Sequence, residues 1–402
     1  MPLKKIAFNS VLTLFLLILS GWLIIHNWQH RKIYHKNYSF TVEEANKLKN
    51  FPRALYAYGL NAWYQNDTAA AARFLRQAVA QDSFYMDAWL RLAQAEVGLG
   101  NPEKAGTILR FTDHLTQNVY RWKWDQTLLA RELGMEGVLL RNINFLLGHR
   151  TMVPDAFQLL DLHLNRSAAA AVQVLDSGNL IPFLEWLMLW GRAEDADIAW
   201  QKIDEHGIAD EDIRLKYVHF LIGKKRVPQA AKIWRAHTGL DGIANPGFEH
   251  EITHRGFDWR YTADSRGKWS IRRTLSEALA GVHSLKIMFE GNENLSFAHL
   301  YQIVPVDPLT PYRLIYNWRS RNITTDQGPF VEIYGYDRKG IYFKGPMMLD
   351  THEWHDQDVD FAVPENCHAV VVRLRRLPSK RFDSKIAGTL WLDDFTLEKM
   401  RR

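Results

Sequence analysis

The chain has 402 residues, more than a single hydrophobic core usually serves, so at least two folded domains are expected. Hydrophobic residues make up 47% and charged residues 24%, which excludes general disorder and a protein with many membrane spans. The 50 basic and 45 acidic residues are interleaved and leave a net charge of +5, so composition gives no support for a nucleic-acid partner. A single cysteine, Cys367, excludes an internal disulfide.

An apolar run over residues 6–25 opens the chain and follows Lys4 and Lys5. About 20 such residues cross the hydrocarbon of a bilayer, and Trp22 lies near the far end, where aromatic rings favour the interface. A cleaved signal peptide is the alternative, but no cleavage site of small residues follows the run. We therefore predict a tail and transmembrane anchor over residues 1–27.

The orientation expected for this anchor places the N-terminus in the cytoplasm, because so short a tail is rarely translocated. The protein is then predicted to be a single-pass protein of a bacterial inner membrane, with most of the chain in the periplasm. Residues 28–50 are predicted to be a juxtamembrane spacer with a short helix, since Thr41 and Glu44 have the spacing of a capping box.

A repeat with a period of about 34 residues begins after the spacer. Leu55, Gly59, Ala71, Leu75 and Ala78 are followed one period later by Trp89, Ala93, Ala105, Leu109 and Thr112. Ala196 and Trp200 recur at the same interval as Ala230 and Trp234, although the distance from Ala105 to Ala196 is not a whole number of periods. A fixed period with small residues where helices cross predicts stacked helical hairpins. The middle, residues 118–180, is expected to be irregular.

These residues resemble the pattern of the tetratricopeptide repeat family, over about 51–241. The resemblance implies an α-solenoid whose groove binds a segment of a protein partner. The tryptophans of the pattern, Trp89, Trp200 and Trp234, are expected to pack inside the hairpins and not to face a ligand.

From Asn245 onward the apolar residues alternate with polar ones, as in Leu285, Ile287 and Phe289. Alternation of this kind predicts half-buried antiparallel strands. Eight or nine short strands separated by Gly and Pro turns predict a β-sandwich or jelly roll over 245–400. The fold class expected is therefore a multidomain chain, first α and then β.

The motif Asn245-Pro246-Gly247-Phe248-Glu249 and the closing Leu392-Asp393-Asp394-Phe395 resemble galactose-binding-like jelly rolls found among carbohydrate-binding modules. The resemblance implies a structural calcium ion held by Glu249 and Asp393, because calcium prefers such oxygen ligands. The alternative is that these carboxylates cap strands or pair with arginines. No other cofactor is expected.

Two motifs are weighed for catalysis and rejected. His250-Glu251-Ile252-Thr253-His254 matches the zinc-protease pattern, but that motif needs a helix, and in a strand the two histidines stand about 13 Å apart. Asp358 and Asp360 share one strand face and lack a partner across a cleft, as a glycosidase pair requires. We therefore expect no enzyme activity.

Glycan contacts are predicted on the polar strand faces, where flat aromatic rings and planar charged groups suit sugar rings and hydroxyls. The candidates are Arg319, Glu332, Tyr334, Tyr336 and Arg373. The alternative is ordinary cross-strand packing of exposed tyrosines. Trp318 alternates with the apolar set and is expected in the core.

The combined prediction is a membrane-anchored, non-catalytic adaptor in the assembly or export of cell-envelope polysaccharide or exopolysaccharide. Its repeats would bind a protein partner and its jelly roll would contact glycan. Two alternatives stay open: a purely structural protein–protein scaffold of an envelope complex, and a glycan-active or metal-dependent hydrolase.

Overall fold

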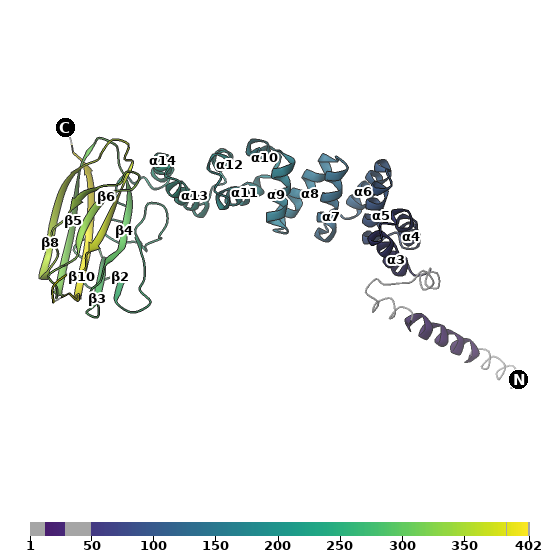
Figure 1. Cartoon of the computed structure of the whole chain (residues 1–402), viewed down its shortest axis with the longest axis horizontal. Helices are drawn as coiled ribbons and strands as arrows, with labels where there is room; N and C mark the ends of the chain where they lie inside the picture. The colour runs from purple at the N-terminus through teal and green to yellow at the C-terminus, as the bar shows by residue number, and fades with distance from the viewer. Residues whose placement is uncertain (1–12, 29–49, 383, 401–402) are drawn as a thin grey trace. The chain divides into compact units, whose positions relative to one another are not determined.

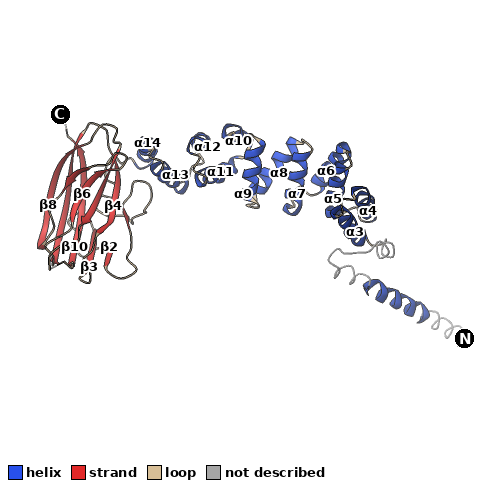
Figure 2. Cartoon of the chain, viewed as in Figure 1, coloured by secondary structure: helices blue, strands red, loops and turns tan. Residues whose placement is uncertain are grey.

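The computed structural model describes residues 13–28, 50–382 and 384–400 of the chain. It divides into two compact units, Met1–Trp186 with Asp195–Lys202, and Leu187–Glu194 with Ile203–Arg402. Helices extend as far as Thr238 and the strands begin at Arg260. Figure 2 shows the helices in blue and the strands in red. The predicted change from helix to strand near Asn245 is confirmed.

The start of the chain carries a helix over residues 13–28. Among the residues that the structure describes, no helix combines the length and the apolar character that a membrane crossing requires. Residues 6–12 of the predicted span and 29–49 of the predicted spacer, with its capping box, lie outside the described residues.

Two regular helical hairpins follow. Their helices, labelled in Figure 1, are α3 (Pro52–Tyr64), α4 (Thr68–Gln81), α5 (Met86–Gly98) and α6 (Pro102–Leu115). Every boundary of the first hairpin recurs 34 residues later in the second. Ala71 and Ala105 are fully buried, and a Cβ on Gly59 would lie 2.9 Å from Leu75 Cγ. Small residues therefore stand where the helices approach each other closely, as the period predicts.

The third hairpin keeps this interval, with a 3-10 turn, η1 (Tyr120–Trp122), in front of α7 (Lys123–Glu132) and α8 (Glu136–Gly148). The next helices, α9 (Val153–His163) and α10 (Ala168–Val174), are shorter and depart from it, so the irregularity expected over residues 118–180 is confined to the part after α8. The regular interval returns with the helices that complete the helical region. These are α11 (Ser177–Leu189), α12 (Ala193–Glu205), α13 (Glu211–Gly223) and α14 (Val227–Thr238).

The described strands of the second unit form two antiparallel five-stranded sheets, here called sheet A and sheet B. Sheet A has the order β1 (Arg260–Tyr261), β4 (Phe297–Pro305), β9 (Ala369–Arg376), β6 (Phe330–Gly335), β7 (Ile341–Lys344). Sheet B has the order β2 (Trp269–Thr274), β3 (Ser284–Glu290), β10 (Ala387–Lys399), β5 (Pro311–Ile323), β8 (Asp350–Ala362). Neighbours in both sheets are mostly distant in sequence.

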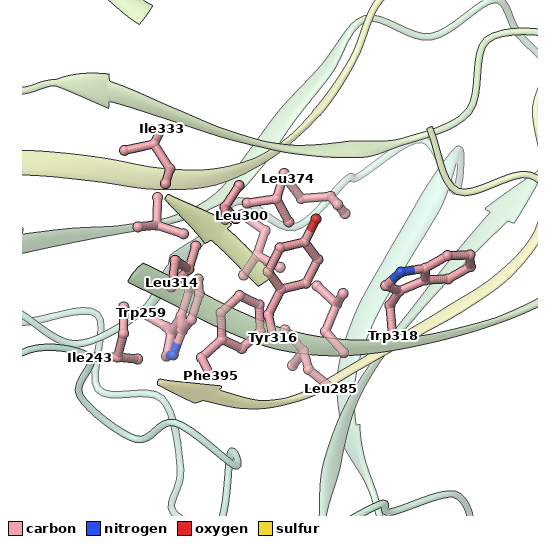
Figure 3. Packing of buried hydrophobic residues seen from close by; sticks show 14 of the residues in the cluster. Ile243, Trp259, Leu285, Leu300, Leu314, Tyr316, Trp318, Ile333, Leu374 and Phe395 are labelled. Atoms are coloured by element: carbon pink, nitrogen blue, oxygen red, sulfur yellow. The ribbon is translucent and has the colours of Figure 1, made fainter. Parts of the chain in front are cut away.

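Apolar side chains from both sheets form one core, part of which Figure 3 shows. Tyr316 and Trp318 of β5 belong to it with exposed fractions of 0% and 6%, so the core position predicted for Trp318 is confirmed. Ile333 of β6 and Leu374 of β9 point into the same core. Because side chains alternate along a strand, the intervening residues of β6 and β9 project from the outer face of sheet A.

The hairpin of α13 and α14 packs against the sandwich inside the second unit. The Trp234 ring of α14 makes an edge contact with Phe257 at 5.9 Å between centroids. It also lies so close to Gly256 that a Cβ there would come within 2.5 Å of the ring. Trp234 therefore fills the junction between the last helix and the start of the sandwich.

Candidate functional site on the outer face of sheet A

A row of polar side chains crosses all five strands of sheet A. The strand register pairs Arg260 with Tyr301, Tyr301 with Arg373, Arg373 with Glu332, and Glu332 with Lys344. Directly paired residues of neighbouring strands lie on the same face of a sheet. The row therefore carries three cations and one carboxylate across the outer face.

Arg373 organises the centre of this row. Its Nε donates to Glu332 Oε2 at 2.7 Å, and a second guanidinium nitrogen contacts the same oxygen. The guanidinium also lies 4.3 Å over the Tyr334 ring. Glu332 is 5% exposed, whereas the Arg373 side chain is 24% exposed. Three of the predicted glycan contacts, Glu332, Tyr334 and Arg373, thus form one cluster.

At the first strand of the row, Arg260 is held in place by backbone oxygens. Its guanidinium donates to the carbonyl oxygens of His254 at 3.3 Å and Gly256 at 2.6 Å. Burial lowers the pKa of the guanidinium from its ordinary value, but the nearby Tyr301 and Tyr336 act in the opposite direction. Arg260 is 9% exposed, and its guanidinium also lies 3.2 Å from His219 Nδ1 of α13, so it is a fixed but buried positive group at this end of the row.

Tyr336 does not join this cluster, contrary to the prediction. It lies beyond the end of β6, and its hydroxyl donates to the carbonyl oxygen of Ile222 on α13 at 3.0 Å. Lys225 Nζ lies 3.3 Å from the ring centroid and donates to the Tyr336 carbonyl oxygen at 3.0 Å. The ring is thus engaged by the last helical hairpin, and partial burial raises the pKa of its hydroxyl.

Arg319 is also separated from the cluster, because its strand, β5, belongs to sheet B. There its guanidinium pairs with Glu277 and with Glu353 at 3.1 Å, and it lies 5.8 Å from the Trp391 ring. The prediction that Arg319 and Arg373 serve one surface is wrong, since the two sheets present different outer faces.

The two predicted calcium ligands anchor the segment before β3. Glu249 Oε1 accepts from the backbone N–H groups of Val282 at 2.8 Å and His283 at 3.1 Å, and Oε2 contacts His283 Nδ1. Asp393 Oδ2 accepts from the backbone N–H groups of Leu279 and Ala280. These contacts agree with the structural alternative for both residues, and calcium binding stays a prediction.

The same contacts shift the two carboxyl groups in opposite directions. The backbone N–H groups of His283 and Val282 lower the pKa of Glu249 to about 2. Burial raises the pKa of Asp393 above its ordinary value, although three backbone N–H groups oppose that rise. Glu249 is therefore the firmly ionised member of the pair.

The catalytic motifs adopt geometries that do not suit their chemistry. Residues 251–254 are neither helix nor strand, and His254 has a positive φ of 59°. Asp360 forms a two-point ion pair with Arg313, at 2.7 Å and 2.9 Å, on sheet B. Within the described residues no group of three or more His, Cys, Asp or Glu side chains is placed to hold a metal ion.

Three members of the row were not predicted as site residues, namely Arg260, Tyr301 and Lys344. Each occupies a polar or half-buried position on a strand, but β7 has only four residues, too few to show a clear alternation. The pairing of β4 with β9 places Tyr301 on the outer face, and the pairing of β6 with β7 places Lys344 there. Pairing of distant strands was the missing information.

Part of the helical region has a family match. Residues 62–117 match the tetratricopeptide repeat family. The match covers the end of α3, all of α4 and α5, and α6. It falls on the two hairpins whose boundaries recur after one period. A comparison with curated proteins found no match.

Several solved carbohydrate-binding modules are similar to part of the chain. A family 4 module has 16% identity and a TM-score of 0.30, covering 39% of this chain and 99% of the module. The xylan-binding CBM22-1 domain of Paenibacillus barcinonensis Xyn10C has 12% identity and a TM-score of 0.26, covering 39% and 93%. A family 16 module has 16% identity and a TM-score of 0.24, covering 33% and 87%.

Proposed function

We propose that this protein is a non-catalytic adaptor whose helical repeats bind a protein partner and whose β-sandwich binds glycan through the outer face of sheet A. The observation that carries the glycan half is the cluster of Glu332, Tyr334 and Arg373. A carboxylate, a guanidinium and a half-buried aromatic ring meet there, and these groups suit sugar hydroxyls and ring faces.

The charge of the row favours an acidic glycan. Arg373 and Lys344 flank a single carboxylate, Glu332, and Arg260 adds a buried cation at the far end of the row, so the row has a surplus of positive charge. A sugar carboxylate would form charge-assisted hydrogen bonds with the guanidinium of Arg373, which are stronger than bonds between neutral groups. We therefore expect uronic-acid polysaccharides to bind better than neutral ones.

The rest of the proposal draws on the sequence. The tetratricopeptide repeat match supports a protein partner for the helices. The apolar run over residues 6–25 supports a membrane anchor, and the joining of two binding folds to it motivates a role in polysaccharide assembly or export at the cell envelope.

The test is binding of the full chain, purified in detergent, to matched acidic and neutral polysaccharides in native gels. Retardation by an acidic glycan should be lost in Tyr334→Leu and reduced at least tenfold in Arg373→Lys, because lysine lacks the planar fork. Lys344→Gln should weaken binding. Lys286→Gln, which removes the same charge from the outer side of sheet B, should leave binding unchanged. Retention of full binding in Tyr334→Leu would refute the assignment of this face.

A second candidate function, a purely structural scaffold, is favoured by one observation. Tyr336, expected on the glycan surface, is instead held by Ile222 and Lys225 of the last helical hairpin. If a folded chain binds none of the polysaccharides, this hairpin contact becomes the main role of the sandwich.

A further inference from the structure

A polar pocket lies on the second helices of two successive hairpins, α6 and α8. It has a volume of about 630 Å³ and lies within the first compact unit. Its charged lining consists of Arg110 and Asp113 from α6, Lys123 from α7, and Arg141 from α8, with Asn142 and Phe145 beside them. This volume is within the range of small-molecule and peptide-side-chain sites, roughly 300–1,000 Å³.

Two polar residues of this lining, Asn142 and Asp113, depart from the repeat pattern. Asn142 occupies the position that Ile108 holds one period earlier and Phe74 two periods earlier. Asp113 occupies the position that Val79 holds one period earlier and Leu147 one period later. The equivalent positions of the neighbouring hairpins are thus apolar. Apolar residues at the equivalent positions allow the same stacking of hairpins, so stacking does not require Asn142 and Asp113 to be polar.

Asn142 is the least satisfied of these groups. It is 1% exposed, and in the described part of the chain neither its Nδ2 nor its Oδ1 has a hydrogen-bond partner. Gln126, on the facing helix α7, donates to Thr116 Oγ1 at 2.9 Å but leaves its Oε1 without a partner. Buried polar groups are normally paired, so the unpaired amide of Asn142 in the lining of the pocket indicates a ligand that supplies the bonds.

The charges of the lining residues indicate that the ligand is negatively charged. Asp113 already pairs with Lys123 at 2.8 Å and with Arg141, and burial of the carboxyl group is outweighed by these cations, so its pKa is lowered. Three cations against one carboxylate leave a positive surplus, carried mainly by Arg110 and Arg141. The Arg141 side chain is 59% exposed and can turn from Asp113 toward an incoming carboxylate.

We propose that this pocket binds a short acidic peptide segment of the protein partner. Asn142 offers a donor group and an acceptor side by side, which a backbone peptide group matches, while Arg110 and Arg141 bind an acidic side chain. Asn142 belongs to the lining of the pocket and is 1% exposed, so the segment contacts it from the pocket side. The inference rests on the proposed protein-binding role of the repeats and adds the place and the chemistry of the contact.

The test uses the full chain in detergent and a fluorescein-labelled hexaglutamate peptide, with hexaglutamine as the neutral probe. Fluorescence anisotropy should show binding of the acidic peptide alone. Affinity should fall at least tenfold in Asn142→Leu, which has the apolar character of the equivalent positions, and in Arg110→Gln. Arg131→Gln removes the same charge from an exposed position of α7 outside this pocket and should have no effect.

Three outcomes would overturn the inference: no binding of hexaglutamate, equal binding by Asn142→Leu, or equal competition by free glutarate, which would assign the site to small carboxylates. A partner of the repeats that binds Asn142→Leu as well as the native chain would leave the proposed function standing and refute this pocket alone. Loss of partner binding in every variant, Arg131→Gln included, would instead count against the protein-binding role.

Discussion

Replacing Asn142 by leucine should make the protein more stable, although it removes a polar side chain from helix α8. Each buried polar group without a partner costs about 1–3 kcal/mol. Asn142 has two such atoms, and leucine of nearly the same shape has none. A poorer fit of the branched side chain would subtract about 1–2 kcal/mol. The difference of these terms spans about 0–5 kcal/mol, so the free energy of unfolding should rise by about 2–3 kcal/mol, the middle of that span.

The matched control lies two positions further along α8. Asn144 Nδ2 donates to the carbonyl oxygen of Val174 at 2.8 Å, and its Oδ1 accepts from Asp176 N at 2.8 Å and Asn179 Nδ2 at 3.0 Å. Asn144→Leu leaves those partners unpaired, so it should lower the free energy of unfolding by about 1–3 kcal/mol.

The assay is urea unfolding of the full chain, followed by far-UV circular dichroism to report on the helices. The two variants should move the helical transition in opposite directions. If Asn142→Leu destabilises as much as Asn144→Leu, then Asn142 has partners in the folded chain, and both the stability reasoning and the ligand pocket fail together. Hydrogen exchange at α8 would give an independent reading of the same difference.

Three further predictions concern the sandwich. Glu249 has a folded-state pKa of about 2, below its ordinary value, so its contribution to stability is present above pH 4.5 and is lost as pH falls toward 2. The melting temperature of Glu249→Gln should therefore depend less on pH in this window than that of the native chain. If Glu249 and Asp393 bind calcium, adding millimolar calcium should raise the melting temperature of the native chain and not of Glu249→Gln, and an equal shift in both would exclude this site. Gly256→Val should loosen the last helical hairpin from the sandwich, because a Cβ there meets the Trp234 ring at 2.5 Å and φ is +53°; hydrogen exchange should rise in α14, and unchanged protection would contradict this account.

The local pattern of the sequence determined much of the architecture. The repeat period located the regular hairpins, because helix length, turn position and small crossing residues all repeat together at Gly59, Ala71 and Ala105. Alternation along the chain located the strands and showed that Trp318 faces inward while Glu332 and Arg373 face outward. These features are periodic along the sequence itself, so a single chain reveals them.

Only the tertiary structure decided which outward residues share a surface. Arg319 and Arg373 are equally polar strand positions, yet one belongs to β5 of sheet B and the other to β9 of sheet A. Tyr336 alternates correctly with Tyr334, but a helix far earlier in the chain engages its hydroxyl. Pairing of distant strands and docking of a hairpin depend on the summed contacts of remote segments, which leave no period in the sequence. The unpaired amide of Asn142 was likewise decided by the tertiary structure, because the absence of a hydrogen-bond partner is seen only when every neighbouring side chain has been placed.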